Sequence, residues 1–199
     1  MRMKRLWHSL RMLLLNNDER RAAYARKAGI YAGIGKHVRI SPKILPVYSE
    51  LIRFHDNVYI ARGVEFITHD TISTMLNHMP ENMKSEIVGE KYRFHEHIGC
   101  IEIMDNVFIG NHAIVLYGTK IGPNVIVAAG SVVNHDCKPN SVYAGVPAKR
   151  VGSFDDFVQR RKDKETKGLF AVTAHNQALE DEEILNAWNI FDADHQHLA

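Results

Sequence analysis

The sequence from Ile103 to Cys137 repeats a pattern every six residues. A β-branched aliphatic residue stands at each step, and a small or β-branched residue follows four positions later. The aliphatic residues are Ile103, Ile109, Val115, Ile121, Val127 and Val133, and the residues four positions later are Val107, Ala113, Thr119, Val125, Ser131 and Cys137. An α-helix with 3.6 residues per turn cannot produce this period, and an alternating strand would show a period of two.

The same period occurs upstream, with a change of phase after residue 44. Ile34 and Ile40 carry it first, and Phe54, Ile60 and Phe66 carry it again; the positions four residues later are Val38, Ile44, Val58 and Val64. A period of six is typical of short strands joined by bends, in which three faces close a triangular turn of about 18 residues. We call one such turn a coil. Successive coils stack by parallel strand pairing about 4.8 Å apart, and we expect the aliphatic residues to point inward.

Two segments carry a family resemblance. "IGNHAIVLYGTKIGPNVIVAAGSVV" and "NSVYAGVPAKRV" resemble the hexapeptide-repeat acyltransferases, whose fold is a mainly β, left-handed parallel β-helix. "AGVPAK" resembles the coenzyme A-dependent O-acetyltransferase branch, which includes maltose, galactoside and capsular polysaccharide acetyltransferases. The resemblance covers roughly residues 30–152 and implies a homotrimer. It also supplies the left hand, since the crossover preference of parallel strands is right-handed.

The chain divides into three parts on this pattern. Residues 1–29 predict one or two helices, broken and capped at "NNDER". Residues 30–152 predict the β-helix, with an inserted loop at 71–97 that lacks the six-residue period. Residues 153–199 predict a helical extension in which Ser153 caps a first helix, Gly168 ends it, a second helix covers 176–191 and a frayed tail follows. The open end of the β-helix needs a cap, and the N-terminal helices are the candidate.

Composition excludes several classes of protein. A net charge of +2 over 199 residues is too small to indicate a nucleic-acid partner. Two cysteines are too few for a disulfide framework, so a reducing cytoplasm is the expected compartment. Cys137 falls on a small inward position and is expected in the core. The sequence contains no run of about 18 apolar residues, so it predicts no transmembrane helix.

The first fifteen residues, "MRMKRLWHSLRMLLL", are basic and partly apolar. Arg11 and His8 interrupt the apolar stretch and no small-residue cleavage site follows, so we do not interpret it as a signal peptide. Two interpretations stay open. We expect a helix that packs on its own protein, and the alternative is an amphipathic helix in peripheral contact with a membrane surface.

The six-residue rhythm stops at "VEFITHD", residues 64–70. In the resembling enzymes a long loop interrupts one coil, and the catalytic histidine stands where coil gives way to loop; His69 has that place here. The resemblance implies that His69 is the general base that takes the proton of a saccharide hydroxyl during acetyl transfer from acetyl coenzyme A, without a covalent enzyme intermediate. His78, His95 and His97 in the loop are rival bases. Adjacent side chains on an extended chain point opposite ways, so Asp70 is interpreted as a turn residue.

The resemblance also implies residues that bind coenzyme A. Asn111 and Ala129 match positions that contact the pantetheine arm, in a slot between coils of two subunits. Asn134 matches a position near the diphosphate, although this chain has Asn134 and His135 where the family often has threonine and lysine. Lys149 matches a base that meets the nucleotide phosphates, and Arg150 is its neighbour.

Three alternatives to a polysaccharide O-acetyltransferase stay open. One is an O-acetyltransferase acting on a hydroxylated antibiotic. Another is a metal enzyme resembling the gamma-class carbonic anhydrases, which need three imidazoles around zinc. There His112 would be the first ligand of a pair, but Tyr117 stands at the second place, so no metal is expected. The third is a non-catalytic trimeric scaffold.

Overall fold

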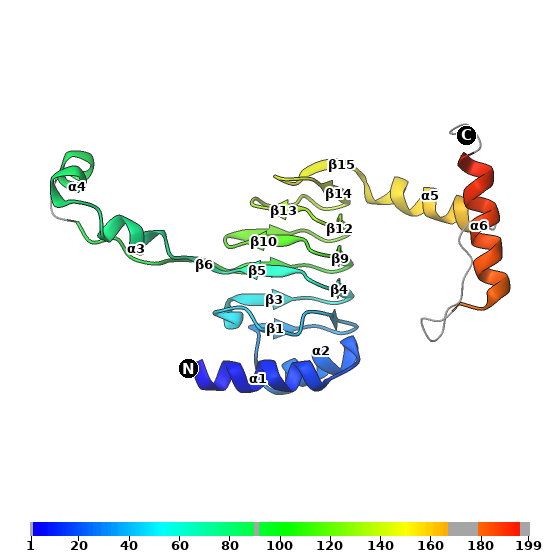
Figure 1. The fold of residues 1–199 in the computed structure, drawn as a ribbon, viewed down its shortest axis with the longest axis horizontal. Coiled ribbons are helices and arrows are strands. Elements are labelled where there is room, and N and C mark those ends of the chain that lie inside the picture. The colour runs from blue at the N-terminus through cyan, green and yellow to red at the C-terminus, as the bar shows by residue number, and fades with distance from the viewer. Residues whose placement is uncertain (1, 90–91, 167–178, 196–199) are drawn as a thin grey trace. The chain divides into compact units, whose positions relative to one another are not determined.

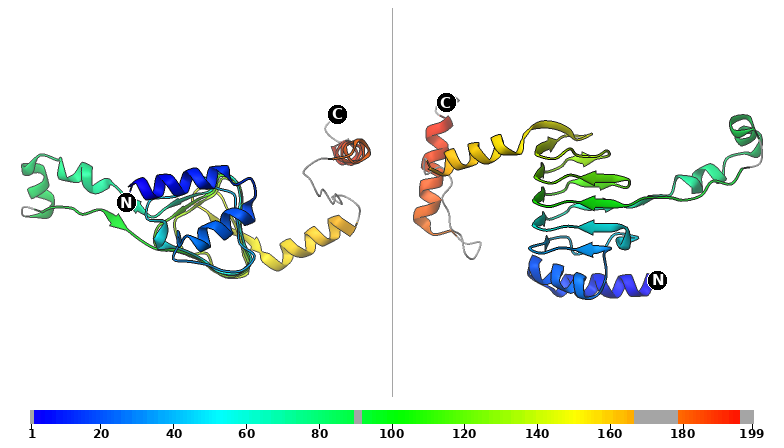
Figure 2. Two further views of the ribbon diagram at one scale, coloured as in Figure 1. Left: turned by 90° about the horizontal axis from the view of Figure 1, so that it is seen from below. Right: turned by 180° about the vertical axis from the view of Figure 1, so that it is seen from behind.

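Short parallel strands stack into a β-helix (Figure 1), whose three-sided cross-section is seen along the stack in Figure 2, left. The structure is a computed structural model that describes residues 2–89, 92–166 and 179–195. The chain divides into two compact units, Met1–Phe154 and Asp155–Ala199. The first unit contains every strand described below, so the β-helix and its attachments belong to one unit.

Three parallel sheets form the faces of the β-helix. The first face contains β1 (Gly33–Ile34), β3 (Ile52–Phe54), β8 (Ile101–Ile103) and β11 (Thr119–Ile121). The second contains β2 (Arg39–Ile40), β4 (Val58–Ile60), β9 (Val107–Ile109), β12 (Val125–Val127), β14 (Ser141–Ala144) and the antiparallel edge strand β15 (Lys149–Ser153). The third contains β5 (Glu65–Ile67), β10 (Ile114–Leu116) and β13 (Val132–Val133).

The inward positions of the repeat are buried as predicted, apart from Ile34, which is partly buried, and Ile44. All six aliphatic residues from Ile103 to Val133 have no exposed side-chain area, and the residues four positions later are at most 3% exposed. The prediction for Ile44 is wrong, because this side chain is 76% exposed and Leu45 is buried instead. In the first coil Arg39 pairs with Tyr59 twenty positions later, two more than the eighteen positions that separate Phe108 from Ile126, and the third side of this coil has no strand. The extra length shifts the phase at this point.

A column of asparagines marks one corner of the β-helix. Each of four coils places an asparagine there with a positive φ of 53–57°, a conformation that asparagine tolerates better than most residues. Each side-chain amide donates a hydrogen bond of 2.7–2.9 Å to the carbonyl of the next, in the order Asn57, Asn106, Asn124, Asn140. The column fixes the register of successive coils.

The insertion leaves the β-helix as an arm (Figure 2). β6 (His69–Asp70) pairs antiparallel with β7 (His97–Ile98) at its base. The helices α3 (Ile72–Asn77) and α4 (Glu81–Val88) lie further out, although the sequence pattern did not predict them. The side chain of Asn77 exchanges two 2.8 Å hydrogen bonds with the backbone of Phe94, which ties the end of α3 to the returning segment of the arm.

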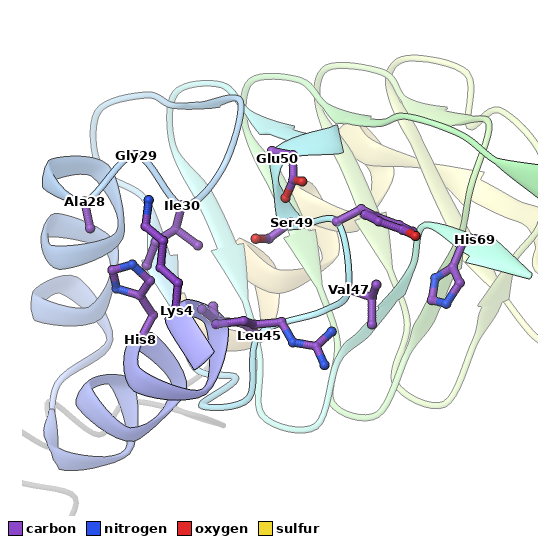
Figure 3. Close-up of a pocket in the computed structure, with 12 residues that line it drawn as sticks. Lys4, His8, Ala28, Gly29, Ile30, Leu45, Val47, Ser49, Glu50 and His69 are labelled. Atoms are coloured by element: carbon purple, nitrogen blue, oxygen red, sulfur yellow. The ribbon is translucent and has the colours of Figure 1, made fainter. Parts of the chain in front are cut away.

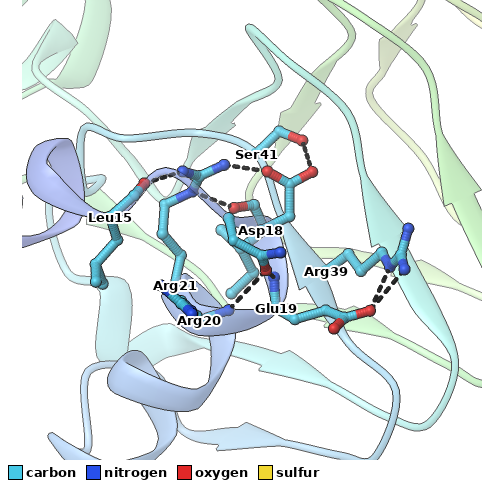
Figure 4. A network of polar contacts seen from close by, with 9 residues as sticks. Leu15, Asp18, Glu19, Arg20, Arg21, Arg39 and Ser41 are labelled. Carbon is cyan, nitrogen blue, oxygen red and sulfur yellow. Dashed lines mark hydrogen bonds and ion pairs between the residues drawn. The ribbon is translucent and has the colours of Figure 1, made fainter. Parts of the chain in front are cut away.

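Two helices cover the first coil: α1 (Arg2–Leu14) and α2 (Asp18–Lys27). The Asn17 side chain accepts hydrogen bonds from the first backbone N–H groups of α2, so the break at "NNDER" acts as a cap. Arg21 is on the buried side of α2, where its Nε donates to the carbonyl of Ile40 at 2.7 Å (Figure 4). Its guanidinium also contacts the Leu15 carbonyl and the Asp18 carboxylate. These bonds fasten the cap to the end of the β-helix.

The second unit contains the helix α6 (Asp181–His195) and most of α5 (Phe154–Thr166). The end predicted at Gly168 and residues 176–178 lie outside the described ranges. The frayed tail is wrong for residues 192–195, which continue α6. Acids in the first turn and His195 in the last suit the helix dipole there. In the described parts of the chain, no helix has both the length and the apolar composition needed to cross a bilayer.

Candidate active site

His69 stands where the β-helix gives way to the arm. The preceding residue, Thr68, is fully buried, and its hydroxyl donates to the Val47 carbonyl at 2.5 Å. On the returning strand, the N–H of Gly99 donates to the Thr68 carbonyl at 2.9 Å. The backbone beside His69 is therefore held by the coil below it and by the return of the arm.

The imidazole of His69 is partly buried against two polar side chains. Its side chain is 23% exposed, and its ring meets the edge of Tyr48 with centroids 5.3 Å apart. Nε2 lies 3.7 Å from Oε1 of Glu96, while the Tyr48 hydroxyl donates to Oε2 of the same carboxylate at 3.2 Å. The Glu96 carboxylate raises the pKa of Tyr48, through this hydrogen bond first and through its charge second. Nδ1 of His69 is buried and has no hydrogen-bond partner among the described residues.

A hollow of about 630 Å³ separates His69 from the N-terminal helix (Figure 3). Leu45 and residues 47–49 form its floor at the place where the first coil has no third strand. Lys4, Arg5 and His8 of α1 line one side, and His69 and Glu50 line the other. The hollow therefore combines cations, a carboxylate and an imidazole on elements that the coil and its cap hold in place.

A second polar cluster lies at the base of the arm. The Tyr117 hydroxyl donates to Oδ2 of Asp70 at 2.5 Å, and Oδ1 accepts the N–H of Ile72 at 3.1 Å, as expected for a turn residue. The bond from Tyr117 is the main cause of a lowered pKa of Asp70, with smaller contributions from the Ile72 N–H and from His97 and His69. Asp70 is the last residue of β6, and its carboxylate bonds to the start of α3 and joins the arm to the third coil.

The rival histidines occupy exposed positions on the arm. His78 follows α3 directly and bonds through Nδ1 to the Thr74 carbonyl of that helix at 2.6 Å. His97 pairs with Asp70 in the β6–β7 ladder, and its ring lies 5.2 Å from that of Tyr117. His95 is exposed. Only His69, of these four, lines the hollow.

The predicted coenzyme A residues fall at three places on the β-helix surface. Asn111 and Ala129 are exposed at one corner, in successive coils, where the Gly130 N–H donates to the Asn111 carbonyl at 2.8 Å. The backbones approach so closely there that a Cβ on Gly110 would lie 2.5 Å from the N of Ala129. Asn134 is at the opposite end of the third face, on the corner of His69 but two coils further on.

The two basic residues follow the last coil. The "AGVPAK" segment closes it, since the N–H of Val132 donates to Gly145 and that of Ala148 to Val132. Lys149 and Arg150 are exposed on β15, and Nε of Arg150 donates to the Ser141 hydroxyl at 2.9 Å. One subunit therefore brings Asn111 and Ala129 together, and Lys149 and Arg150 together, but leaves both pairs apart from His69.

Asn134 and His135 contact each other after the strand β13. Asn134 Oδ1 lies 2.8 Å from Nδ1 of His135, at the place where the resembling family often has threonine and lysine. His112 and Tyr117 flank β10 at its two ends, and the Tyr117 hydroxyl is bonded to Asp70, which argues against a shared metal. The described residues contain no group of three His, Cys, Asp or Glu side chains placed to hold a metal ion.

Tyr48 and Glu96 are site residues that the sequence analysis missed. Tyr48 lies in the segment where the six-residue phase shifts, so it had no repeat position. Glu96 lies between His95 and His97, immediately before the chain re-enters the coil. That re-entry is the available signal, because a strand that leaves the coil at His69 must return beside it.

Comparisons with known proteins agree with the repeat. Residues 101–135 match the bacterial transferase hexapeptide (six repeats) family. The chain is 27% identical over 139 residues to galactoside O-acetyltransferase of Escherichia coli K12, an alignment that covers 64% of this chain and 66% of that protein. It is 49% identical over 65 residues to 2,3,4,5-tetrahydropyridine-2,6-dicarboxylate N-acetyltransferase of Clostridium perfringens, covering 33% of this chain and 26% of that protein. The chain thus spans about two thirds of the first relative and a quarter of the second.

Two solved structures have a similar fold. A maltose O-acetyltransferase from Clostridium difficile 630 superposes with a TM-score of 0.53 at 24% identity, covering 75% of this chain and 85% of that one. A hexapeptide-repeat-containing acetyltransferase from Vibrio cholerae, solved in complex with acetyl coenzyme A, has a TM-score of 0.50 at 21% identity, covering 77% and 86%. The six-residue repeat is buried within three parallel faces, and residues 101–135 of this repeat are those that match the bacterial transferase hexapeptide family.

Proposed function

We propose that this protein transfers the acetyl group of acetyl coenzyme A to a hydroxyl of a saccharide, in a surface or capsular polysaccharide pathway, with His69 as the general base. The position of His69 carries the proposal, because its imidazole borders a hollow at the junction of coil and arm and faces the Glu96 carboxylate. The galactoside and maltose O-acetyltransferases among the similar proteins support a saccharide acceptor. The left hand of the β-helix is part of the same proposal.

His69 first accepts a proton from the acceptor hydroxyl and then donates it to the leaving group. A saccharide hydroxyl is un-ionised at neutral pH, so the neutral imidazole takes its proton as the oxygen attacks the thioester carbonyl. The imidazolium then gives that proton to the departing sulfur. Glu96, 3.7 Å from Nε2, favours the transient positive charge, and the edge contact with Tyr48 limits rotation of the ring. General-base help of this kind is worth roughly 10²–10⁴ in rate.

The acyl donor fits exposed groups at two of the places described above. Asn111 and Ala129 offer amide groups at one corner for the pantetheine arm, and Lys149 and Arg150 offer cations for the phosphates. Because both pairs lie apart from His69 within one subunit, we propose that a homotrimer completes each site across a subunit boundary. A stable monomer in sedimentation at micromolar concentration would contradict this assembly.

The reaction is tested by thiol release from acetyl coenzyme A against a panel of galactosides, maltose, other saccharides and hydroxylated antibiotics. We expect release with a saccharide. His69→Ala should reduce turnover by 10²–10⁴-fold while the trimer and its melting temperature stay unchanged. His97→Ala is the matched control on the neighbouring strand. If His69→Ala keeps its turnover and His97→Ala loses it, the base is misassigned; release with antibiotics alone would favour the drug-modifying alternative.

The donor site has a separate test. Lys149→Ala should raise KM for acetyl coenzyme A and leave kcat much less affected, because phosphates far from the thioester supply mostly uniform binding. The lost contact is worth about 1.5–3 kcal/mol if it is charge-assisted. An unchanged KM would remove Lys149 from the donor site.

A further inference from the structure

The N-terminal helix α1 turns its apolar side away from the protein. Six large apolar residues are 46–85% exposed and recur at helical spacing along one stripe: Met3, Leu6, Trp7, Leu10, Leu13 and Leu14. At 100° per residue this stripe covers about 120° of the helix surface. The sequence expectation of a helix that packs on its own protein therefore holds for only one of its sides.

The side of α1 that meets the protein is mostly polar. His8 bonds to the Tyr24 hydroxyl at 2.7 Å, and the N–H of Leu45 donates to the Ser9 hydroxyl at 3.3 Å. Arg5 is partly buried, and Met12 alone on this side is fully buried. A helix that served only as a cap would bury its leucines and expose its polar residues. The reversed arrangement indicates that a second apolar surface covers the exposed stripe.

Charge identifies the kind of surface. Residues 1–17 contain four lysines and arginines and no acid, so the rest of the chain has a net charge of −2 against +2 for the whole. Lys4 and Arg11 are exposed, and Arg11 stacks over the Trp7 ring at 5.4 Å. The helix α6 also exposes large apolar residues, but it begins with three acids. A basic helix with an aromatic residue and leucines on its apolar side suits an anionic bilayer surface.

We infer that α1 lies in the headgroup region of an anionic membrane and holds the protein there peripherally. Over its 13 residues the helix is about 20 Å long, so it can lie in the interface but not cross it. Its apolar stripe enters the acyl boundary, Lys4 and Arg11 meet the acidic headgroups, and its polar side stays bound to α2 and the first coil.

The test uses the full chain with Trp188→Phe, which leaves Trp7 as the single tryptophan, and excites it at roughly 295 nm, beyond tyrosine absorption. With vesicles of phosphatidylcholine and about 30% phosphatidylserine, we expect co-sedimentation and a blue shift of the Trp7 emission. Leu6→Ser with Leu10→Ser should weaken vesicle partitioning about 100-fold, or about tenfold for each leucine that loses apolar contact. The matched control is Met83→Ser with Ile87→Ser, an exposed pair at the same spacing on α4, which should change nothing.

The charge component is tested separately. Lys4→Gln with Arg11→Gln should weaken partitioning to the anionic vesicles about 30-fold, or about fivefold for each cation, and should leave partitioning to pure phosphatidylcholine unchanged. Equal binding to both kinds of vesicle would overturn the assignment of an anionic surface. So would an absence of vesicle binding, or a change in sedimentation mass of the leucine variant without lipid, which would identify a second copy of the chain as the partner.

Discussion

The buried Arg21 gives the sharpest test of how the N-terminal helices are attached. Arg21→Met keeps the length and apolar stem of the side chain but removes the guanidinium from the Ile40 and Leu15 carbonyls and from Asp18. Removing one partner of a buried ion pair costs about 3–5 kcal/mol. Asp18 is 28% exposed and keeps its 2.7 Å bond from the Ser41 hydroxyl, so we expect the lower end, about 3 kcal/mol.

The loss should also be local. Coils in a solenoid contact only their neighbours, so weakening the cap opens the structure from that end. Hydrogen exchange should show protection lost in α2, β1 and β2 while β9 and β12 in the central coils keep theirs. Urea unfolding followed by circular dichroism measures the total change.

Arg39→Met is the matched control for Arg21→Met. Arg39 of β2 bonds at 2.6 Å to Glu19, which is on α2 like Arg21. Both side chains are more than half exposed, and exposed ion pairs are worth about 0–1 kcal/mol. Equal losses in the two variants would refute the claim that burial makes Arg21 important. A loss of protection spread evenly over all coils would refute its role as a local fastening.

Three further outcomes are expected. Phe66→Ala should lower the free energy of unfolding by about 3–5 kcal/mol in urea titration, because it empties an inward position that is 7% exposed. The hydrogen bond from Lys120 is the largest cause that lowers the pKa of Glu102 from 4.5 to about 2. The ionised carboxylate therefore stabilises the fold above pH 4.5, and this contribution is lost as the pH falls from 4.5 towards 2. Glu102→Gln should make stability less dependent on pH within this range, as acid unfolding measures. Burial raises the pKa of Cys137 to about 12, so a thiol reagent should titrate Cys100 alone in the native protein.

The sequence predicted the coils well because their inward positions are set by one local rule. Each aliphatic residue at the six-residue step is buried by the coil above and the coil below, so the sequence pattern directly identifies the residues that pack in the core. Ile44 failed because the first coil has a different length, and period alone does not locate an added residue. The placement of His69 followed from the end of the repeat.

The contacts around His69 could not be predicted in the same way. Tyr48 and Glu96 reach the imidazole from segments 21 and 27 residues away in the chain, and neither segment has the repeat. Likewise, the amphipathic pattern of α1 predicted a helix with an apolar side but not the side that packs. That choice depends on the Tyr24 hydroxyl and the Leu45 backbone N–H, which offer hydrogen-bond partners to His8 and Ser9 on the polar side of α1.

The asparagine column has a consequence for how such a chain can change in length. Neighbouring asparagines in it are 49, 18 and 16 residues apart in sequence, yet each pair makes one hydrogen bond of nearly the same length. The column therefore has one asparagine for each of its four coils, and its hydrogen bonds do not depend on how many residues separate successive asparagines in the sequence. Insertions and deletions on the other two corners leave it intact, as the arm between Asn57 and Asn106 demonstrates. Evolution can lengthen, shorten or exchange that arm without disturbing the stack that carries it.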